Sequence, residues 1–185
     1  MLADYNEVLP GKLWVGSFFS PEGSKQLHRL GITTVVNLQT DLDLKSEGIS
    51  LKKLVQALAE VDIDLMRVPL EDFNEQALAR DLSACVDTLE LLMAPGWAKV
   101  YLHCTAGVQR SPTVAAAYLM KSRGWSAEKA CAYLTEKRDC RPYRRMLEQY
   151  ERTLTVSAQE AWTEAYQHRG CGPTSEPQET RTKTI

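Results

Sequence analysis

Residues 99–112 read KVYLHCTAGVQRSP, and this stretch decides the fold. Its apolar beginning, residues 99–102, predicts a strand at the centre of a sheet. Pro112 suits the first turn of a following helix, where a missing N–H costs little. The loop between them turns successive backbone N–H groups inward and receives the positive end of the helix dipole. The stretch therefore predicts an anion-binding loop beyond the carboxyl end of a central strand.

The side chains of this loop suit attack on a phosphate ester. Arg110 offers a planar fork that can bind two phosphate oxygens. The helix terminus and this cation favour the thiolate form of Cys104, which is the attacking species. Ser111 can offer its hydroxyl to the sulfur when the phosphocysteine breaks down. A cysteine and an arginine at this spacing also occur by chance, so the inference depends on the agreement between the loop, the strand before it and the helix after it.

Backbone amides of the loop complete the expected phosphate site. Gly107 can take the positive φ that such a tight turn needs. We expect the phosphate oxygens to be held by the amides of Thr105, Ala106, Gly107, Val108, Gln109 and Arg110. Because the loop supplies the positive charge itself, we expect neither a metal ion nor a cofactor.

Strands and helices alternate along the rest of the chain. The expected strands are residues 13–15, 33–38, 65–70 and 99–102, and the expected helices are residues 21–30, 49–58, 78–93, 112–121, 127–135 and 144–166. This order predicts a single α/β domain with a central, mostly parallel sheet flanked by helices. We assign the domain to residues 1–168. Residues 169–185 are rich in Gly, Pro, Thr and Glu, and we expect them to be disordered.

Composition is that of an ordinary globular protein, with 44% hydrophobic and 25% charged residues in a chain of 185. A net charge of −2 gives no bulk reason to expect nucleic acid or an anionic membrane as a partner. No apolar run approaches the ~18 residues of a membrane span, and residues 1–4 lack the features of a signal peptide. We expect a monomer that is cytoplasmic, or the mature form of an organelle protein such as one of the plastid stroma.

Five cysteines are present, and no two of them form a CxxC pair. An odd number without such pairs argues against a disulfide scaffold or a zinc site. We expect four of them to be reduced, buried small hydrophobic residues. Cys104 is the exception.

HCTAGVQRSP, residues 103–112, resembles the HCxxGxxR(S/T) loop of the protein tyrosine phosphatase superfamily, and within it the chain resembles the small dual-specificity phosphatases. Further segments resemble the plant glucan phosphatases of the starch-excess group. These segments are LWVGS near the N-terminus, VVNLQTDLDL at 35–44, EDFN at 71–74, YLHCTAG at 101–107 and LTEKRDCRP at 134–142. The resemblance covers roughly residues 5–145.

The resemblance implies a general acid, an aspartate on a loop before the cysteine. Asp72 closely follows the expected strand that ends at residue 70 and is our choice. It would protonate the leaving oxygen and later activate water. Asp64, at a strand start, and Asp81, inside a helix, are the competitors, and a solvated loop or helix-cap role for Asp72 is the alternative.

Other roles follow from the same resemblance. His103 is expected to set the environment of the cysteine without transferring protons. Phe73 is expected at the mouth of the pocket. Asp41 and Asp43 are expected on a recognition loop as substrate contacts, or equally in a solvated turn.

Three positions depart from the glucan phosphatase pattern. Gln109 stands where glucan phosphatases usually carry Gly, and it could crowd the pocket or bond a substrate hydroxyl. Ser111 replaces Ala and matches protein-directed enzymes. Residues 45–47 (KSE) stand where the plant enzymes carry aromatic residues that stack on sugars. The remaining candidate platforms are Tyr5, Trp14, Phe18, Phe19 and Phe73, although Trp14 is better explained as core.

Three functions remain open at this point. The first is a phosphatase acting on phosphorylated glucan, and the second is a dual-specificity phosphatase acting on phosphoserine, phosphothreonine or phosphotyrosine in proteins. The third is a phosphate-binding scaffold without turnover. The intact set of Cys104, Arg110 and Asp72 argues against the scaffold, whereas Gln109 keeps it open.

Overall fold

A computed structural model of the chain describes residues 1–168. The predicted disordered tail, residues 169–185, lies outside the described residues. Met1–Arg152 form one compact unit, and the chain from Thr153 belongs to a second unit. The elements that build the candidate site all lie in the first unit.

A five-stranded sheet with the order β1-β2-β5-β3-β4 runs through the described part of the chain. Its strands are β1 (Tyr5–Leu9), β2 (Leu13–Gly16), β3 (Thr34–Asn37), β4 (Asp64–Arg67) and β5 (Val100–His103). β1 pairs with β2 in antiparallel fashion, and the pairs β2–β5, β5–β3 and β3–β4 are parallel. The prediction of a mostly parallel central sheet is therefore confirmed, and β5 lies at its centre.

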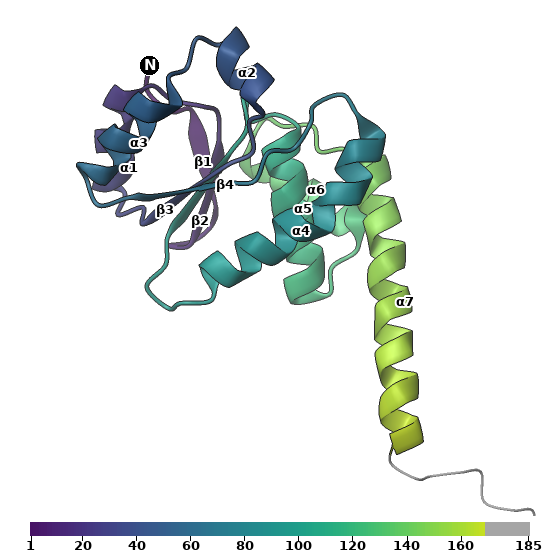
Figure 1. Ribbon diagram of the computed structural model, residues 1–185. Helices are drawn as coiled ribbons and strands as arrows, with labels where there is room; N and C mark the ends of the chain where they lie inside the picture. The colour runs from purple at the N-terminus through teal and green to yellow at the C-terminus, as the bar shows by residue number, and fades with distance from the viewer. Residues whose placement is uncertain (169–185) are drawn as a thin grey trace, which may run out of the picture. The chain divides into compact units, whose positions relative to one another are not determined.

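Helices cover both faces of this sheet, as predicted. The described residues form the helices α1 (Ser24–Arg29, after a 3-10 turn at Pro21–Gly23), α2 (Asp41–Ser46), α3 (Leu51–Ala59), α4 (Glu75–Met93), α5 (Arg110–Arg123), α6 (Ala127–Lys137) and α7 (Arg144–His168). Figure 1 shows α1 and α3 on one side of the sheet and α4, α5 and α6 on the other.

Two elements were not predicted. β1 is an edge strand whose first three residues are partly or fully exposed, so its sequence YNEVL lacks a buried apolar run. α2 is short and starts with a reciprocal cap in which Thr40 and Asp43 bond each other's backbone N–H. Neither element shows the apolar periodicity by which the other helices and strands were found.

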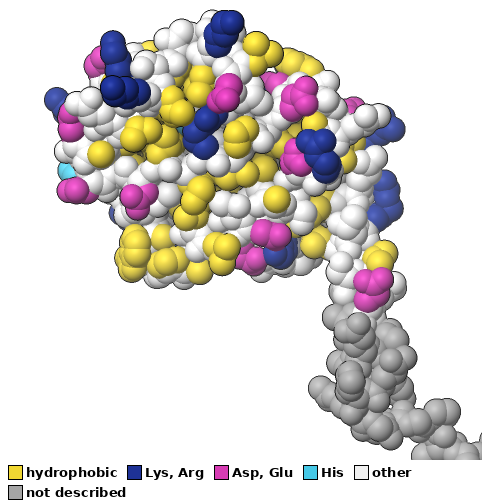
Figure 2. Space-filling model, in the orientation of Figure 1, with side chains coloured by type: hydrophobic (Ala, Val, Ile, Leu, Met, Phe, Trp, Pro, Cys, Tyr) yellow, Lys and Arg dark blue, Asp and Glu magenta, His cyan; other side chains and the backbone are white. Residues whose placement is uncertain are grey.

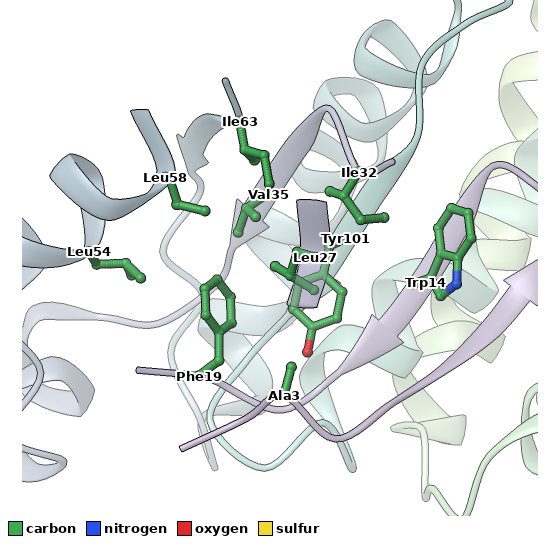
Figure 3. Close-up of a cluster of buried hydrophobic side chains, with 10 residues drawn as sticks. All are labelled: Ala3, Trp14, Phe19, Leu27, Ile32, Val35, Leu54, Leu58, Ile63 and Tyr101. Atoms are coloured by element: carbon green, nitrogen blue, oxygen red, sulfur yellow. The ribbon is translucent and has the colours of Figure 1, made fainter. Parts of the chain in front are cut away.

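The core beneath α1 and α3 is a compact cluster of apolar side chains. Figure 3 shows this cluster, which contains Leu54 and Leu58 of α3, Leu27 of α1, and Val35 and Tyr101 of the sheet. Trp14 is 6% exposed and Phe19 is 1% exposed, so both belong to this core. Burial of Trp14 was expected, whereas Phe19 is removed from the set of candidate sugar platforms.

On the face drawn in Figure 2, charged side chains of one sign do not gather into a single patch. Lysine and arginine side chains are interspersed there with aspartate and glutamate. Within residues 1–168, no helix is long and apolar enough to cross a membrane.

Leu58 offers a test of this packing. Its side chain is 1% exposed in the cluster under α3, so Leu58→Ala should lower the free energy of unfolding by about 3 kcal/mol. Val55 lies on the same helix with 45% of its surface exposed, and Val55→Ala should change stability by less than about 0.5 kcal/mol. Denaturant unfolding measures both variants. Equal losses would contradict this packing.

Candidate active site

The loop after β5 sits at the centre of the carboxyl edge of the sheet. His103, the last residue of β5, aligns with Gly16 of β2 on one side and with Asn37 of β3 on the other. Phe18 donates a backbone hydrogen bond to Thr105 O at 2.9 Å, so the segment after β2 lies against the loop. Ligands of parallel sheets bind at this edge, and the fold therefore places the predicted anion site at the expected edge of the sheet.

Cys104 lies inside this loop, 3% exposed. The Gly107 N–H donates to its Sγ at 3.3 Å, and the Ser111 hydroxyl lies 3.4 Å from the same sulfur. Such donors stabilise a negative sulfur. Ser111 therefore lies within reach of the sulfur, and its role in the breakdown of the phosphocysteine stays a prediction.

Arg110 is 1% exposed and is held from several sides. Its Nη1 donates to Asp43 Oδ2 at 2.8 Å and to Leu70 O at 3.0 Å, and its Nη2 donates to Asp43 Oδ1 at 3.2 Å and to Thr105 Oγ1 at 3.1 Å. Asp72 Oδ2 lies 3.0 Å from the same Nη2. In contrast, the buried Nε finds no hydrogen-bond partner within the described residues. The guanidinium is therefore fixed in place with one N–H donor still to be satisfied.

Asp43 corrects an expectation from the sequence. It was placed on a loop, but it lies in the first turn of α2 with its side chain 19% exposed and binds Arg110 through both carboxylate oxygens. Burial raises the pKa of Asp43, but hydrogen bonds from Arg110 and Thr40 outweigh burial, so the pKa is lowered. The alternative of a solvated turn is wrong for Asp43.

Asp41 also lies in α2 and not on a loop. Its side chain is 90% exposed and pairs with Arg67 at 2.8 Å. A surface pair of this kind contributes little to stability. A contact between Asp41 or Asp43 and substrate stays a prediction.

Asp72 is the one of the three candidate acids with a contact to the loop among the described residues. Besides Arg110, it accepts a hydrogen bond from Tyr143 Oη at 2.7 Å. Asp81 lies within α4 and pairs with Arg80 at 2.7 Å. Asp64 begins β4 and so lies at the amino edge of the parallel sheet, away from the loop. The geometry favours Asp72.

Phe73 follows Asp72 and projects from the surface, with 85% of its area exposed. Its backbone has a φ of 56°, in the left-handed region that is unfavourable for residues other than glycine. Its N–H donates to Asp72 Oδ1 at 3.1 Å. The backbone strain therefore coincides with an exposed aromatic ring beside the candidate acid.

His103 is buried and packs its ring against Tyr101 and Phe19. Burial lowers the pKa of His103 to about 4; the bond to Cys104 O opposes this shift, and the charge of Arg110 adds to it. A carbonyl oxygen only accepts, so Nδ1 carries the proton that is shared with Cys104 O at 3.0 Å. The imidazole is neutral near pH 7, which fits the expected supporting role without proton transfer.

Arg138 and Tyr143 belong to the site but were not predicted. Arg138 is 6% exposed; its Nε donates to Gly107 O at 2.8 Å, and its two other nitrogens bond Asn6 and Asp4. Arg138 lies within LTEKRDCRP, a segment that resembles the glucan phosphatases, and this resemblance is a signal by which the sequence could have indicated it. Tyr143 follows that segment and carries no such signal.

The other predicted positions are also accounted for. Gln109 is half-buried and precedes α5 without a side-chain cap bond. Cys85 and Cys140 are free and buried as expected, whereas Cys131 is free and only half-buried. Cys171 lies outside the described residues.

A thiol and a guanidinium buried in one strand–loop–helix unit, with a carboxylate beside them, define the class of cysteine-dependent phosphatases. The chain belongs to the dual specificity phosphatase family: residues 13–153 match the model of the family's catalytic domain. The matched range includes Cys104, Arg110 and Asp72.

Two curated relatives carry different substrate names. The chain is 30% identical over 140 residues to phosphoglucan phosphatase DSP4, amyloplastic, of Castanea sativa, a match that covers 75% of this chain and 37% of that protein. It is 30% identical over 132 residues to dual specificity protein phosphatase Mpk3 of Drosophila melanogaster, covering 71% of this chain and 29% of that protein. The chain thus spans well under half the length of either relative.

Solved structures share the fold. The crystal structure of PTPMT1 has a TM-score of 0.69 at 18% identity, with 85% of this chain and 99% of that chain covered. At this identity the likeness concerns the fold alone, and it confirms the predicted α/β architecture.

Gly107 tests how closely the loop is packed. A Cβ at this position, where φ is +71°, would lie 2.4 Å from the backbone carbon of Gly16. Gly107→Ala should displace the loop and lower phosphatase activity by more than about tenfold. Gly124 has a φ of +63° with no atom within 4 Å of such a Cβ. Gly124→Ala should therefore carry the same backbone strain but keep its phosphatase activity. Equal losses of activity in the two variants would show that the contact with Gly16 is not the cause.

His103 should make stability depend on pH. In the unfolded chain its imidazole gains a proton below about pH 6.5, but in the folded protein it does so only as the pH approaches its pKa of about 4. Between these values the unfolded state binds more protons, so this stability is fully present above pH 6.5 and is lost as the pH falls. The loss should be on the order of 3 kcal/mol.

Denaturant unfolding at a series of pH values measures this effect. Asparagine does not titrate, so His103→Asn should flatten the slope of stability against pH between pH 6.5 and 4. A slope that survives in His103→Asn would assign the effect to other groups.

Proposed function

We propose that this chain hydrolyses phosphate monoesters in two chemical steps through a phosphocysteine. The observation that carries the proposal is the buried Arg110, fixed by Asp43 with its Nε unsatisfied, in the same loop as Cys104. A buried N–H without a partner is costly in a folded protein. A phosphate oxygen bound in the loop would satisfy it.

In the first step, the Cys104 thiolate attacks phosphorus, and a new S–P bond forms as the bond to the leaving oxygen breaks. The amides of residues 105–110 and Arg110 hold the three equatorial oxygens. Asp72 donates its proton to the leaving oxygen, which departs as an alcohol. The incoming phosphate oxygens compete with Asp72 for Arg110, which leaves the Asp72 carboxyl free to face the leaving oxygen.

In the second step, water releases the phosphate. The Asp72 carboxylate removes a proton from water, the water oxygen attacks phosphorus, and the S–P bond breaks with its electron pair returning to sulfur. The Ser111 hydroxyl, 3.4 Å from that sulfur, can donate to it as the charge returns.

Phosphorylated glucan is the substrate class that we propose first. Phe73 is the observation that favours it, because an exposed ring beside the acid can stack on the sugar that carries the phosphate. The 30% identity to a protein named as a phosphoglucan phosphatase supports the same choice. Leu42 of α2, 75% exposed, adds a second exposed apolar side chain at a position close in sequence to Asp43.

Phosphoprotein is the second candidate. It is favoured by Ser111 at the sulfur and by the equal identity to a relative named as a dual specificity protein phosphatase. Trp14 and Phe19, two of the five aromatic candidates for binding sugars, are buried and cannot stack on a substrate. With fewer exposed aromatic rings to stack on successive sugars, a long glucan chain is less favoured as the substrate.

Phosphate release distinguishes these candidates. Phosphorylated amylopectin is compared with phosphotyrosine and phosphoserine peptides, and Cys104→Ser should lower kcat by at least about 10³-fold on every substrate. Cys131→Ser, at a half-buried free cysteine away from the loop, is the matched control and should retain activity. Full activity in Cys104→Ser would overturn the mechanism.

Substrate class is then read from the ratio of rates. Phe73→Ala should reduce release from amylopectin by about tenfold more than release from a small aryl phosphate if the ring stacks on sugar. A wild-type preference for peptides, with no selective loss in Phe73→Ala, would assign the chain to phosphoproteins. Phosphate binding without release from any substrate would favour a scaffold.

A further inference from the structure

Tyr143 connects the candidate acid to the phosphate loop. It lies between α6 and α7, and its phenol donates to Asp72 Oδ1 at 2.7 Å. The backbone N–H of Tyr143 donates to Thr113 Oγ1 at 2.8 Å, and that hydroxyl donates to Gln109 O at 2.7 Å. Asp72 in turn contacts Arg110 at 3.0 Å. These contacts form a closed circuit that starts and ends in the loop.

The two oxygens of Asp72 have different partners. Oδ1 accepts from the Tyr143 phenol and from the Phe73 N–H, whereas Oδ2 faces Arg110. An oxygen that already accepts two hydrogen bonds is the poorer site for a proton. Once substrate phosphate has taken over Arg110, Oδ2 loses its cationic partner while Oδ1 keeps its two donors. A proton on Asp72 is then directed to Oδ2, the oxygen on the side of the phosphate site.

Tyr143 remains a donor throughout the working pH range. Burial, together with the bond to Asp72 and its charge, raises the pKa of Tyr143 to about 12. The other charged groups nearby are already engaged: Asp43 binds Arg110, and Glu75 pairs with Arg145 at 3.2 Å. Glu71, the neighbour of Asp72, accepts from the side chain of Asn74.

We propose that Tyr143 is a positioning residue for proton transfer, which holds Asp72 at the phosphate site and directs its proton to Oδ2. The inference rests on the proposed function of Asp72 as the acid. Substrate phosphate competes for Arg110, and the phenol is then the side chain that still anchors the carboxyl. Asp72 needs this anchor because its own side chain is 23% exposed and the next residue, Phe73, has a strained backbone.

The test uses the dependence of rate on the leaving group. The full chain with Tyr143→Phe is compared with wild type by kcat/KM, which reports steps up to formation of the phosphocysteine. For an alkyl phosphate, whose leaving oxygen needs a proton, kcat/KM should fall about tenfold. For an aryl phosphate with an acidic phenol as leaving group, it should stay within about twofold. A merely structural defect would lower both rates alike and would overturn the inference.

Tyr133 provides the matched control. Its phenol also donates one hydrogen bond of 2.7 Å, to Val8 O, away from the loop. Tyr133→Phe should leave the ratio of the two rates unchanged. If it changes the ratio as much as Tyr143→Phe does, the inference fails.

A double-mutant cycle with Asp72→Asn completes the test. If Tyr143 acts through Asp72, Tyr143→Phe should add less than about twofold to the loss in Asp72→Asn on the alkyl phosphate. If Tyr143→Phe instead costs a further tenfold in the Asp72→Asn background, Tyr143 does not act through Asp72 and this inference fails. The proposed function survives that result as long as the activity of the wild type depends on Cys104. If the wild type hydrolyses neither ester, or if Cys104→Ser hydrolyses them as fast as the wild type, the proposed function fails and this inference fails with it.

Discussion

The buried guanidinium of Arg110 is the charge around which the site is built. A cation that is 1% exposed must be compensated, because transfer of an unpaired charge from water to a protein interior is very costly. Compensation comes from three separate segments of the chain: α2 supplies Asp43, the segment after β4 supplies Leu70 O and Asp72, and the loop supplies Thr105. Positions far apart in sequence are thereby brought to one edge of the sheet.

A second layer holds the backbone of the loop. Arg138 Nε donates to the carbonyl of Gly107, and a Cβ on Gly107 would collide with the backbone of Gly16. Tyr101, in the strand before the loop, donates to Ser17 O at 2.6 Å and so ties β5 to the segment after β2. The nucleophile is thus carried on a rigid frame, whereas the candidate acid sits on a partly exposed segment. A fixed phosphate site with a partly exposed carboxyl beside it agrees with a reaction in which one carboxyl first donates and then accepts a proton.

Much of the architecture could be predicted because each signal was local. The prediction placed four strands and the helices with apolar periodicity within a few residues of their observed ends. Of these strands, β2, β3 and β5 are buried throughout, whereas β4 is partly exposed. β1 was missed because an edge strand is exposed, and α2 was missed because a cap between Thr40 and Asp43, not an apolar face, defines it. The loop residues, from Cys104 to Ser111, were identified because their spacing on a strand–loop–helix unit has a direct chemical meaning.

By itself, the sequence determined the α/β class, the anion-binding loop and the family to which the chain belongs, since these depend on residues that are neighbours along the chain. Only the tertiary structure decided that Asp43 binds Arg110, that Asp72 and not Asp64 or Asp81 reaches the loop, and that Tyr143 bonds Asp72. Contacts of this kind join residues tens of positions apart. They depend on how the sheet and helices pack, which no local pattern of residue types encodes.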